Sequence, residues 1–134
     1  MLPLDEDEFA RWFKSAEITL RSAASDHSSG FFNWSCFKSQ QAAEFAIKAY
    51  LRGIGSPSYG HSISHLLKEG GFSSNLVDLG KVLDKYYIPT RYTDSWSDGV
   101  PEDYYTVNES NESMKISRKI IEAVMKKWTL LKKG

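Results

Sequence analysis

The sequence has a single cysteine, no net charge and no long apolar run, and each of these absences excludes a class of protein. The lone Cys36 excludes an internal disulfide, which fits a reducing compartment, and its apolar neighbours predict a core residue rather than a nucleophile. The 17 Lys and Arg residues balance 17 Asp and Glu residues. We therefore expect no broad electrostatic surface for nucleic acid, which leaves room only for a local basic pocket.

Membrane and secretion signals are also missing. No stretch approaches the roughly 18 apolar residues needed to span a bilayer, and the acidic first eight residues contain no hydrophobic signal core. The glycine-rich residues 52–60 lack the Gly-Lys-Ser/Thr ending of a phosphate-binding loop. With 41% hydrophobic and 25% charged residues among 134, we expect one globular, cytoplasmic domain over residues 1–134.

Helical periodicity is the main pattern in the sequence, and strand signals are weak. Apolar residues recur at intervals of three and four, between segments rich in Asp, Ser, Asn, Gly and Pro. The predicted helices cover residues 5–26, 32–52, 62–69 and 74–87 and a C-terminal segment capped by Asn108 or Asn111, with Asp5 and Ser74 as further caps. The fold class is all-α: an antiparallel four-helix up-down bundle plus a short extra helix and a long ordered loop.

The predicted helix over residues 32–52 is apolar on two faces. One stripe contains Cys36, Phe37, Ile47, Tyr50 and Leu51, and the other contains Ala42, Phe45, Ala46 and Ala49. A helix of this kind is usually buried on both sides, so it lies either at the centre of the bundle or in a dimer interface. Gln40 and Glu44 fall on the first stripe, where buried polar groups need partners.

Residues 88–107 show no clear period, yet they contain four aromatic side chains among Pro, Asp, Ser and Gly: Tyr92, Trp96, Tyr104 and Tyr105. Loops of this length are uncommon inside compact domains, and those that stay ordered are often functional. The aromatic side chains predict that this loop packs onto the bundle. It is the best candidate site that the residue pattern alone provides.

Four segments resemble the HEPN domain (higher eukaryotes and prokaryotes nucleotide-binding). Residues 36–51, CFKSQQAAEFAIKAYL, resemble its second-helix signature QQAAEKALK. Residues 61–67, HSISHLL, resemble its HDLxxLL segment and place His61 on the family's histidine. Residues 83–94, LDKYYIPTRYTD, resemble the stretch ending in RYPD, and EDYYT at residues 102–106 also matches. Ser62 replaces the usual Asp, and Thr93 replaces the usual Pro.

The resemblance implies a helical bundle that commonly forms homodimers. Members often occur beside small nucleotidyltransferases in prokaryotic two-gene modules of the toxin–antitoxin kind, and other members bind nucleotides or cleave RNA. The ribonucleases carry an Arg followed after four to six residues by a His, in the later part of the bundle. Here only Arg21 and His27 have that spacing, near the end of the first predicted helix. The nuclease motif is therefore missing, and we expect neither a cofactor nor a metal.

Two charged residues have competing interpretations. Arg91 either holds a phosphate through two hydrogen bonds or forms an ion pair with Glu44 or Asp94. Glu44 either forms an exposed helix-face pair with Lys48 or is buried and pairs with Arg91, and we favour the second arrangement.

His61 either acts on a proton or phosphate near neutral pH or satisfies backbone groups at a helix start. It also lies four residues before His65, a zinc-ligand spacing, but no third ligand has a recognisable position. Tyr92 and Tyr104 either stack on a base or attach the loop to the core. The predicted nucleotide site lies in the groove between the second helix and the loop and consists of Arg91, Tyr92, His61, Glu44, Lys48 and Tyr104.

Three functions are consistent with this sequence. The leading hypothesis is a HEPN protein without nuclease activity that binds a nucleotide or supports a nucleotidyltransferase partner. The second is a metal-independent ribonuclease toxin that uses His61 or His27 as general acid and base. The third is a structural dimerisation module whose polar residues serve packing.

Overall fold

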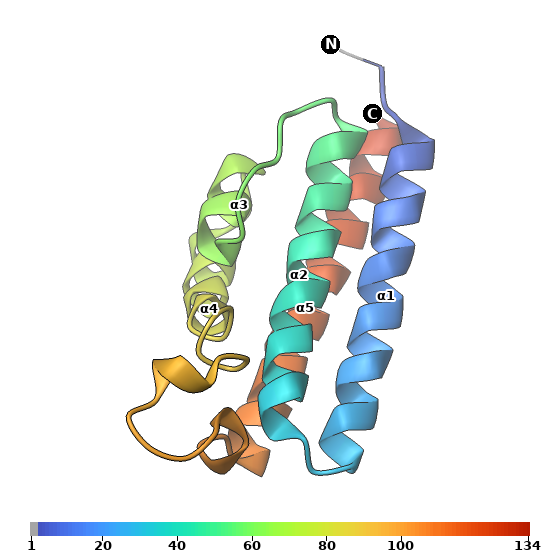
Figure 1. Ribbon diagram of the computed structural model, residues 1–134. Helices are drawn as coiled ribbons and strands as arrows, with labels where there is room; N and C mark the ends of the chain where they lie inside the picture. The colour runs from blue at the N-terminus through green and yellow to red at the C-terminus, as the bar shows by residue number, and fades with distance from the viewer. Residues whose placement is uncertain (1–2) are drawn as a thin grey trace.

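The computed structural model describes residues 3–134, which fold into five α-helices without a strand (Figure 1). Met1 and Leu2, at the start of the acidic N-terminal segment, lie outside the described residues. The helices are α1 (Glu6–Ser28), α2 (Phe32–Gly53), α3 (Ile63–Glu69), α4 (Ser74–Asp84) and α5 (Val107–Lys133). None of these helices is both long and apolar enough to cross a bilayer. The predicted all-α class is confirmed.

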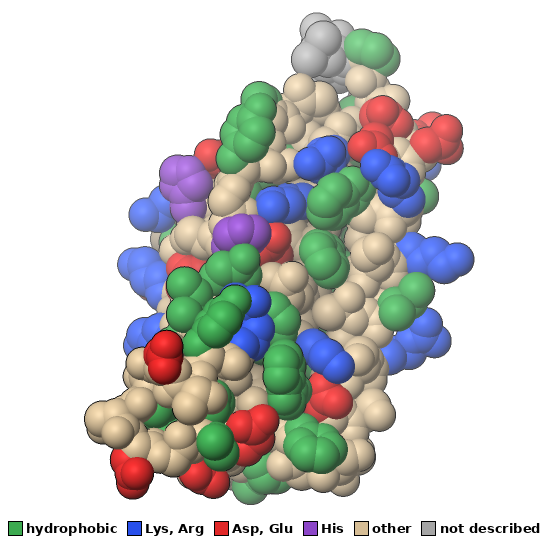
Figure 2. All heavy atoms as spheres, viewed as in Figure 1, with side chains coloured by type: hydrophobic (Ala, Val, Ile, Leu, Met, Phe, Trp, Pro, Cys, Tyr) green, Lys and Arg blue, Asp and Glu red, His purple; other side chains and the backbone are tan. Residues whose placement is uncertain are grey.

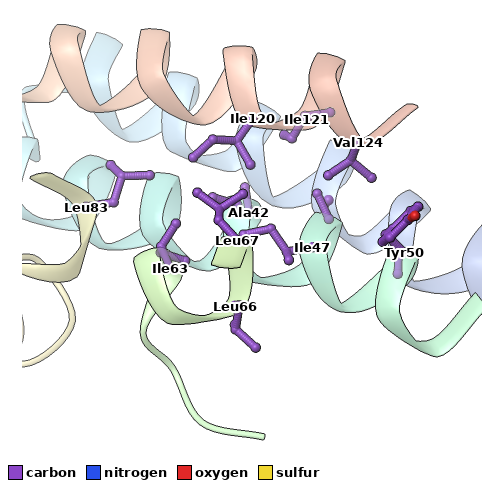
Figure 3. Packing of buried hydrophobic residues seen from close by; sticks show 14 of the residues in the cluster. Ala42, Ile47, Tyr50, Ile63, Leu66, Leu67, Leu83, Ile120, Ile121 and Val124 are labelled. Atoms are coloured by element: carbon purple, nitrogen blue, oxygen red, sulfur yellow. The ribbon is translucent and has the colours of Figure 1, made fainter. Parts of the chain in front are cut away.

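The helix α2 is the centre of the bundle, which is one of the two positions predicted from its two apolar faces. It packs against α1 and α5 and also against α3 and α4. Figure 3 shows Ala42 and Ile47 of α2 close to Leu67 of α3 and Ile120 of α5. All four side chains are fully buried, and burial of each large aliphatic side chain contributes roughly 1.5–3 kcal/mol.

The short helix α3 and α4 form an antiparallel pair on one side of α2. Asp84, the last residue of α4, accepts hydrogen bonds from the backbone N–H groups of Ile63 and Ser64 at the start of α3. The sequence predicts that α4 extends to residue 87, but the helix ends three residues earlier. Pro89 explains this difference, because the residue before a proline avoids the helical conformation and proline has no N–H to donate.

Two helix N-caps differ from the prediction. Thr106 caps α5, where Asn108 or Asn111 was expected: its side chain accepts from the Glu109 N–H at 3.1 Å, and Glu109 accepts from the Thr106 N–H at 3.0 Å. This reciprocal pair satisfies two backbone donors, which a lone Asn cap does not do. Ser73 rather than Ser74 caps α4. Asp5 caps α1 as predicted.

The loop between α4 and α5 is ordered, as predicted, and it contains two 3₁₀ turns, Thr93–Ser95 and Pro101–Asp103. The Trp96 indole donates a hydrogen bond to the carbonyl of Pro89 at 2.8 Å. Its ring stacks on Tyr104 at 4.1 Å between centroids and meets the edge of Tyr105 at 5.7 Å. Aromatic packing therefore fixes this long connection at one end of the bundle, below α4 in Figure 1.

Candidate functional site

One face of α2 carries the polar residues of the candidate site. Phe37, Gln40, Glu44 and Lys48 are three or four residues apart, so they lie in one row along the helix. This row faces the start of α3 and the segment that follows α4, as the hydrogen bonds and ring contacts below show. The helix period thus places these side chains in one row, and the fold then brings His61 and Arg91 into contact with them.

Glu44 is a buried carboxylate, only 3% exposed, and its neighbours supply donors. The Lys48 Nζ atom and the His61 Nδ1 atom each lie 3.1 Å from a Glu44 oxygen. The side-chain amides of Gln40 and Gln41 approach the same carboxylate at 3.4 Å. A buried charge persists only with such partners. Since the carboxylate accepts, His61 donates from Nδ1, and its Nε2 atom has no hydrogen-bond partner among residues 3–134.

The predicted ion pair between Glu44 and Arg91 is wrong, because Lys48 and His61 occupy the carboxylate. No carboxylate among residues 3–134 lies within ion-pair distance of Arg91, so the alternative pair with Asp94 is absent too. The Arg91 Nε atom donates to the Tyr87 carbonyl at 2.8 Å. The two terminal nitrogens of the guanidinium have no hydrogen-bond acceptor within the described part of the chain.

Aromatic rings surround the Arg91 guanidinium. Its central carbon lies 4.2 Å from the ring centroid of Phe37, 4.7 Å from that of Tyr87 and 5.0 Å from that of Tyr92. Cation–π attraction of this kind contributes about 0.5–2 kcal/mol, depending on solvent exposure. The side chain is therefore fixed in position while its terminal donors stay unpaired.

Tyr87 connects the two halves of the site. The His61 ring stacks on it at 4.3 Å with an interplanar angle of 16°, and Arg91 contacts the same tyrosine. Five of the six predicted site residues thus come together through a residue that sequence reasoning missed. We call the set the Tyr87 cluster: Glu44, Lys48, His61, Tyr87, Arg91 and Tyr92. The only available signal for Tyr87 was its position inside the HEPN-like segment 83–94.

Tyr104 is the predicted site residue that the fold places elsewhere. Its ring stacks on Trp96, and its hydroxyl donates to the Asp98 carbonyl. A second residue that the sequence did not single out, Asp84, supports His61 indirectly. It binds the first turn of α3, including the Ser64 hydroxyl at 2.6 Å, and thereby holds the chain just after His61.

The other reactive side chains do not join the cluster. His27 contacts the Ser110 hydroxyl at 2.7 Å, and His65 pairs with Glu69 at 2.9 Å. Among residues 3–134, no three His, Cys, Asp or Glu side chains are grouped as metal ligands would be. Burial raises the pKa of the Cys36 thiol to about 11, so it stays protonated at neutral pH and is a poor nucleophile.

Figure 2 shows how this face is arranged. Histidine, basic and hydrophobic side chains adjoin one another in its middle, and acidic side chains lie toward the lower end and at the upper right. The sequence profile of the HEPN domain matches residues 9–128, which is most of the chain. The chain belongs to the HEPN family. A comparison with curated proteins finds no matching relative of this HEPN chain.

Three solved structures are similar to this HEPN chain over nearly their whole length. The protein TT1696 from Thermus thermophilus is 38% identical, with a TM-score of 0.85 over 89% of this chain and 97% of the other. ST0689, an archaeal HEPN homologue, is 35% identical, with a TM-score of 0.78 over 95% and 98%. A HEPN domain protein from Thermotoga maritima is 30% identical, with a TM-score of 0.73 over 89% and 98%.

Proposed function

We propose that this HEPN protein binds a nucleotide at the Tyr87 cluster. The phosphate lies against the Arg91 guanidinium, and the base stacks on Tyr92. The observation that carries the proposal is the state of Arg91, whose ring contacts and Nε hydrogen bond fix the side chain while its terminal nitrogens have no acceptor among residues 3–134.

A fixed guanidinium with free donors suits a phosphate. Two parallel N–H groups match two phosphate oxygens, and charge-assisted bonds of this kind are about twice as strong as neutral ones. The side chain loses little further freedom on binding, because three rings already hold it. A protein that has no net charge and one available guanidinium is expected to bind a single small anion rather than a long polyanion.

The base has an aromatic surface next to this charge. Tyr92 is 52% exposed and lies beside the guanidinium, and stacking of one base on an aromatic ring contributes about 1–3 kcal/mol. The free Nε2 atom of His61 provides a further polar contact across Tyr87. Glu44 holds His61 in place, and Lys48 in turn pairs with Glu44. Neither Glu44 nor Lys48 touches the ligand in this proposal.

The cellular setting of this activity is proposed from family resemblance alone. We infer a cytoplasmic homodimer that acts beside a small nucleotidyltransferase, in a module of the toxin–antitoxin kind. In such a pair, nucleotide binding by the HEPN chain would depend on the nucleotide that the transferase consumes. Nucleotide binding by the purified chain is the part of this proposal to test first.

A thermal-shift screen of the purified chain against nucleoside mono-, di- and triphosphates tests the proposal. A ligand at 100 times its dissociation constant adds about 2.7 kcal/mol, which shifts a domain of this size by several degrees. We expect the shift to vanish in Arg91→Ala, to shrink in Arg91→Lys, and to persist in Arg21→Ala, which removes a charge from α1. No shift with any nucleotide, or an equal shift in Arg91→Ala, contradicts the proposal and favours a purely structural module.

A second candidate function is metal-independent cleavage of RNA. The observation that favours it is the buried Glu44, which orients His61 as carboxylates orient catalytic histidines, with His61 and Arg91 both in contact with the Tyr87 ring. His27, the alternative catalytic residue, contacts Ser110 and Phe32 rather than an Arg. RNA degradation in a chelator, lost in His61→Asn, would support this function, and intact RNA after long incubation would exclude it.

A further inference from the structure

Exposed apolar side chains are concentrated in the segment between α4 and α5. Ten large hydrophobic side chains are exposed among residues 3–134, and five of them lie in residues 88–107: Ile88, Tyr92, Val100, Tyr104 and Val107. Single exposed apolar residues are normal on a protein surface, but a local concentration marks an interaction site. Tyr92 belongs to the Tyr87 cluster, whereas Val100, Tyr104 and Val107 lie outside it.

These side chains are held outward by the structure beneath them. Tyr104 is fixed by its stacking on Trp96 and by its hydrogen bond to the Asp98 carbonyl. The Val100 N–H donates to the Asp103 carboxylate at 3.1 Å, which shapes the second 3₁₀ turn. Val107 is the first residue of α5, directly after the Thr106 cap. With the backbone fixed in this way, the three side chains remain partly exposed: 43% for Val100, 40% for Tyr104 and 50% for Val107.

The same segment of the chain is strongly acidic. Residues 92–114 contain six acidic side chains and no basic one: Asp94, Asp98, Glu102, Asp103, Glu109 and Glu112. None of the six takes part in an ion pair within the described residues. In Figure 2 several acidic side chains lie at the lower end of the molecule, and that end of this face shows no Lys or Arg. We call Val100, Tyr104, Val107, Asp98 and Glu102 the acidic–apolar patch.

The charge of the patch restricts what can cover it. Phosphates, RNA and anionic lipids are repelled by a surface of this sign. A metal ion is not favoured, because the described residues contain no group of three ligands. The basic residues 115–133 of a second copy have the right charge, but part of that segment is already engaged. Lys132 pairs with Glu6, and Lys127 contacts the rings of Tyr50 and Phe72.

We propose that the acidic–apolar patch docks a basic, amphipathic segment of another protein. Apolar side chains of that segment pack on Val100, Tyr104 and Val107, while its Lys or Arg side chains face Asp98 and Glu102. The apolar contacts provide most of the affinity, and the charges select the partner and accelerate its association. This surface works independently of the Tyr87 cluster, so nucleotide binding is not required for it.

Fluorescence anisotropy with defined peptides tests this docking. The probe is a labelled helical peptide of about 18 residues, five turns, with Leu on one face and Lys on the other. A matched peptide replaces each Leu by Ser and keeps every Lys. We expect the amphipathic peptide to bind the parent chain about tenfold more tightly than the matched peptide, a difference of about 1.4 kcal/mol.

Three double variants locate the binding. V100S/V107S removes apolar surface and keeps the charge and Tyr104, and it is expected to lose most of the difference in affinity between the two peptides. D98N/E102Q should weaken the amphipathic peptide about tenfold. The control E17Q/E122Q removes the same charge from exposed positions on α1 and α5 and should have little effect. Circular dichroism and the nucleotide response of each variant show that the fold and the Tyr87 cluster are intact.

Two results would overturn the proposal. The first is equal binding of both peptides to the parent chain, or a loss of affinity in E17Q/E122Q as large as that in D98N/E102Q. Either would show that binding is general electrostatic attraction rather than docking on the patch. Sedimentation velocity gives the other result: a parent chain that self-associates while V100S/V107S is monomeric would assign the patch to a second copy of this chain.

Discussion

At the scale of single residues, the buried charges on α2 decide the chemistry of the candidate site. Glu44 and Lys48 lie one helical turn apart and are both nearly inaccessible to solvent. A buried pair gains little relative to apolar residues of the same size, but the loss of one partner leaves an uncompensated charge. The pair therefore anchors His61 and excludes Arg91 from the carboxylate, which leaves Arg91 available to a ligand.

The substitution Glu44→Leu tests this description of the pair. It leaves Lys48 buried without a counter-charge, so we expect the free energy of unfolding to fall by about 3 kcal/mol or more. The double variant Glu44→Leu/Lys48→Met removes both charges and should recover most of that loss. Urea denaturation of the parent, single and double variants measures the difference. If the single and double variants are equally stable, the pair is not buried as described.

Unlike the charged pair of Glu44 and Lys48, the buried thiol of Cys36 must stay neutral in the folded chain. The stability of the fold therefore depends on pH in the range where the thiol ionises. Burial raises its pKa from an ordinary value of 9.0 to about 11. Between these two values the unfolded chain loses the proton and the folded chain keeps it, so the free energy of unfolding decreases as pH rises. Tyr86, whose pKa is raised to about 12 by burial, adds to the decrease at higher pH.

We expect the free energy of unfolding to fall by on the order of 2 kcal/mol between pH 8 and pH 10.5. In Cys36→Ala the early part of this decrease, just above pH 9, should be missing, because alanine has no proton to lose. Urea denaturation at a series of pH values measures both curves. Parallel curves for the parent and Cys36→Ala would show that the thiol is not the group responsible.

At the scale of helices, side-chain contacts at the helix ends determine where the functional segments begin and stop. The Thr106–Glu109 capping box fixes where the ordered loop stops and α5 begins, and the Asp84 carboxylate fixes the start of α3 beside His61. Both interactions join the bundle to the segments that carry the candidate site and the acidic–apolar patch. A change at either end is thus expected to alter those surfaces before it alters the core.

The N-cap of α5 is tested by two neighbouring substitutions. Thr106→Ala removes the acceptor of the Glu109 N–H and should lower the free energy of unfolding by about 1 kcal/mol. Asn108→Ala, at an exposed position inside the first turn, should change it by less than about 0.5 kcal/mol. Thermal or urea denaturation compares the two variants. A larger loss in Asn108→Ala would return the cap to the position that the sequence pattern favoured.

The helices themselves could be predicted from the sequence, because apolar periodicity depends only on neighbours along the chain. The central position of α2 also follows from its two apolar faces. Cap positions were harder to predict, since Thr106, Asn108 and Asn111 are all suitable cap residues within six positions, and only the fold determines where the helix begins. The partner of Glu44 depends on tertiary geometry, which the sequence does not give. Lys48, one helical turn further along α2, pairs with the Glu44 carboxylate, and Arg91 does not.

At the scale of the whole molecule, the net charge is zero, but the acidic and basic side chains are unevenly distributed along the chain. Residues 92–114 carry only acidic side chains among their charged residues, whereas Arg91 and the basic half of α5 lie outside that segment. The two sites that we propose, the Tyr87 cluster for a phosphate and the acidic–apolar patch for a basic segment, therefore differ in the charge of the ligand that each would bind. The HEPN bundle supports both surfaces on helix ends and an ordered loop, while α2 and its neighbours supply the core.

The most direct test of nucleotide binding at the Tyr87 cluster is a ¹H–¹⁵N spectrum of the chain during titration with ATP, including the arginine Nε–H signals. We expect the Arg91 Nε–H signal, the backbone signals of residues 87–92 and that of His61 to shift together and saturate, while the Nε–H signals of Arg21 and Arg118 stay unchanged. Saturating shifts confined to another surface, or no shift at millimolar ATP, would contradict it.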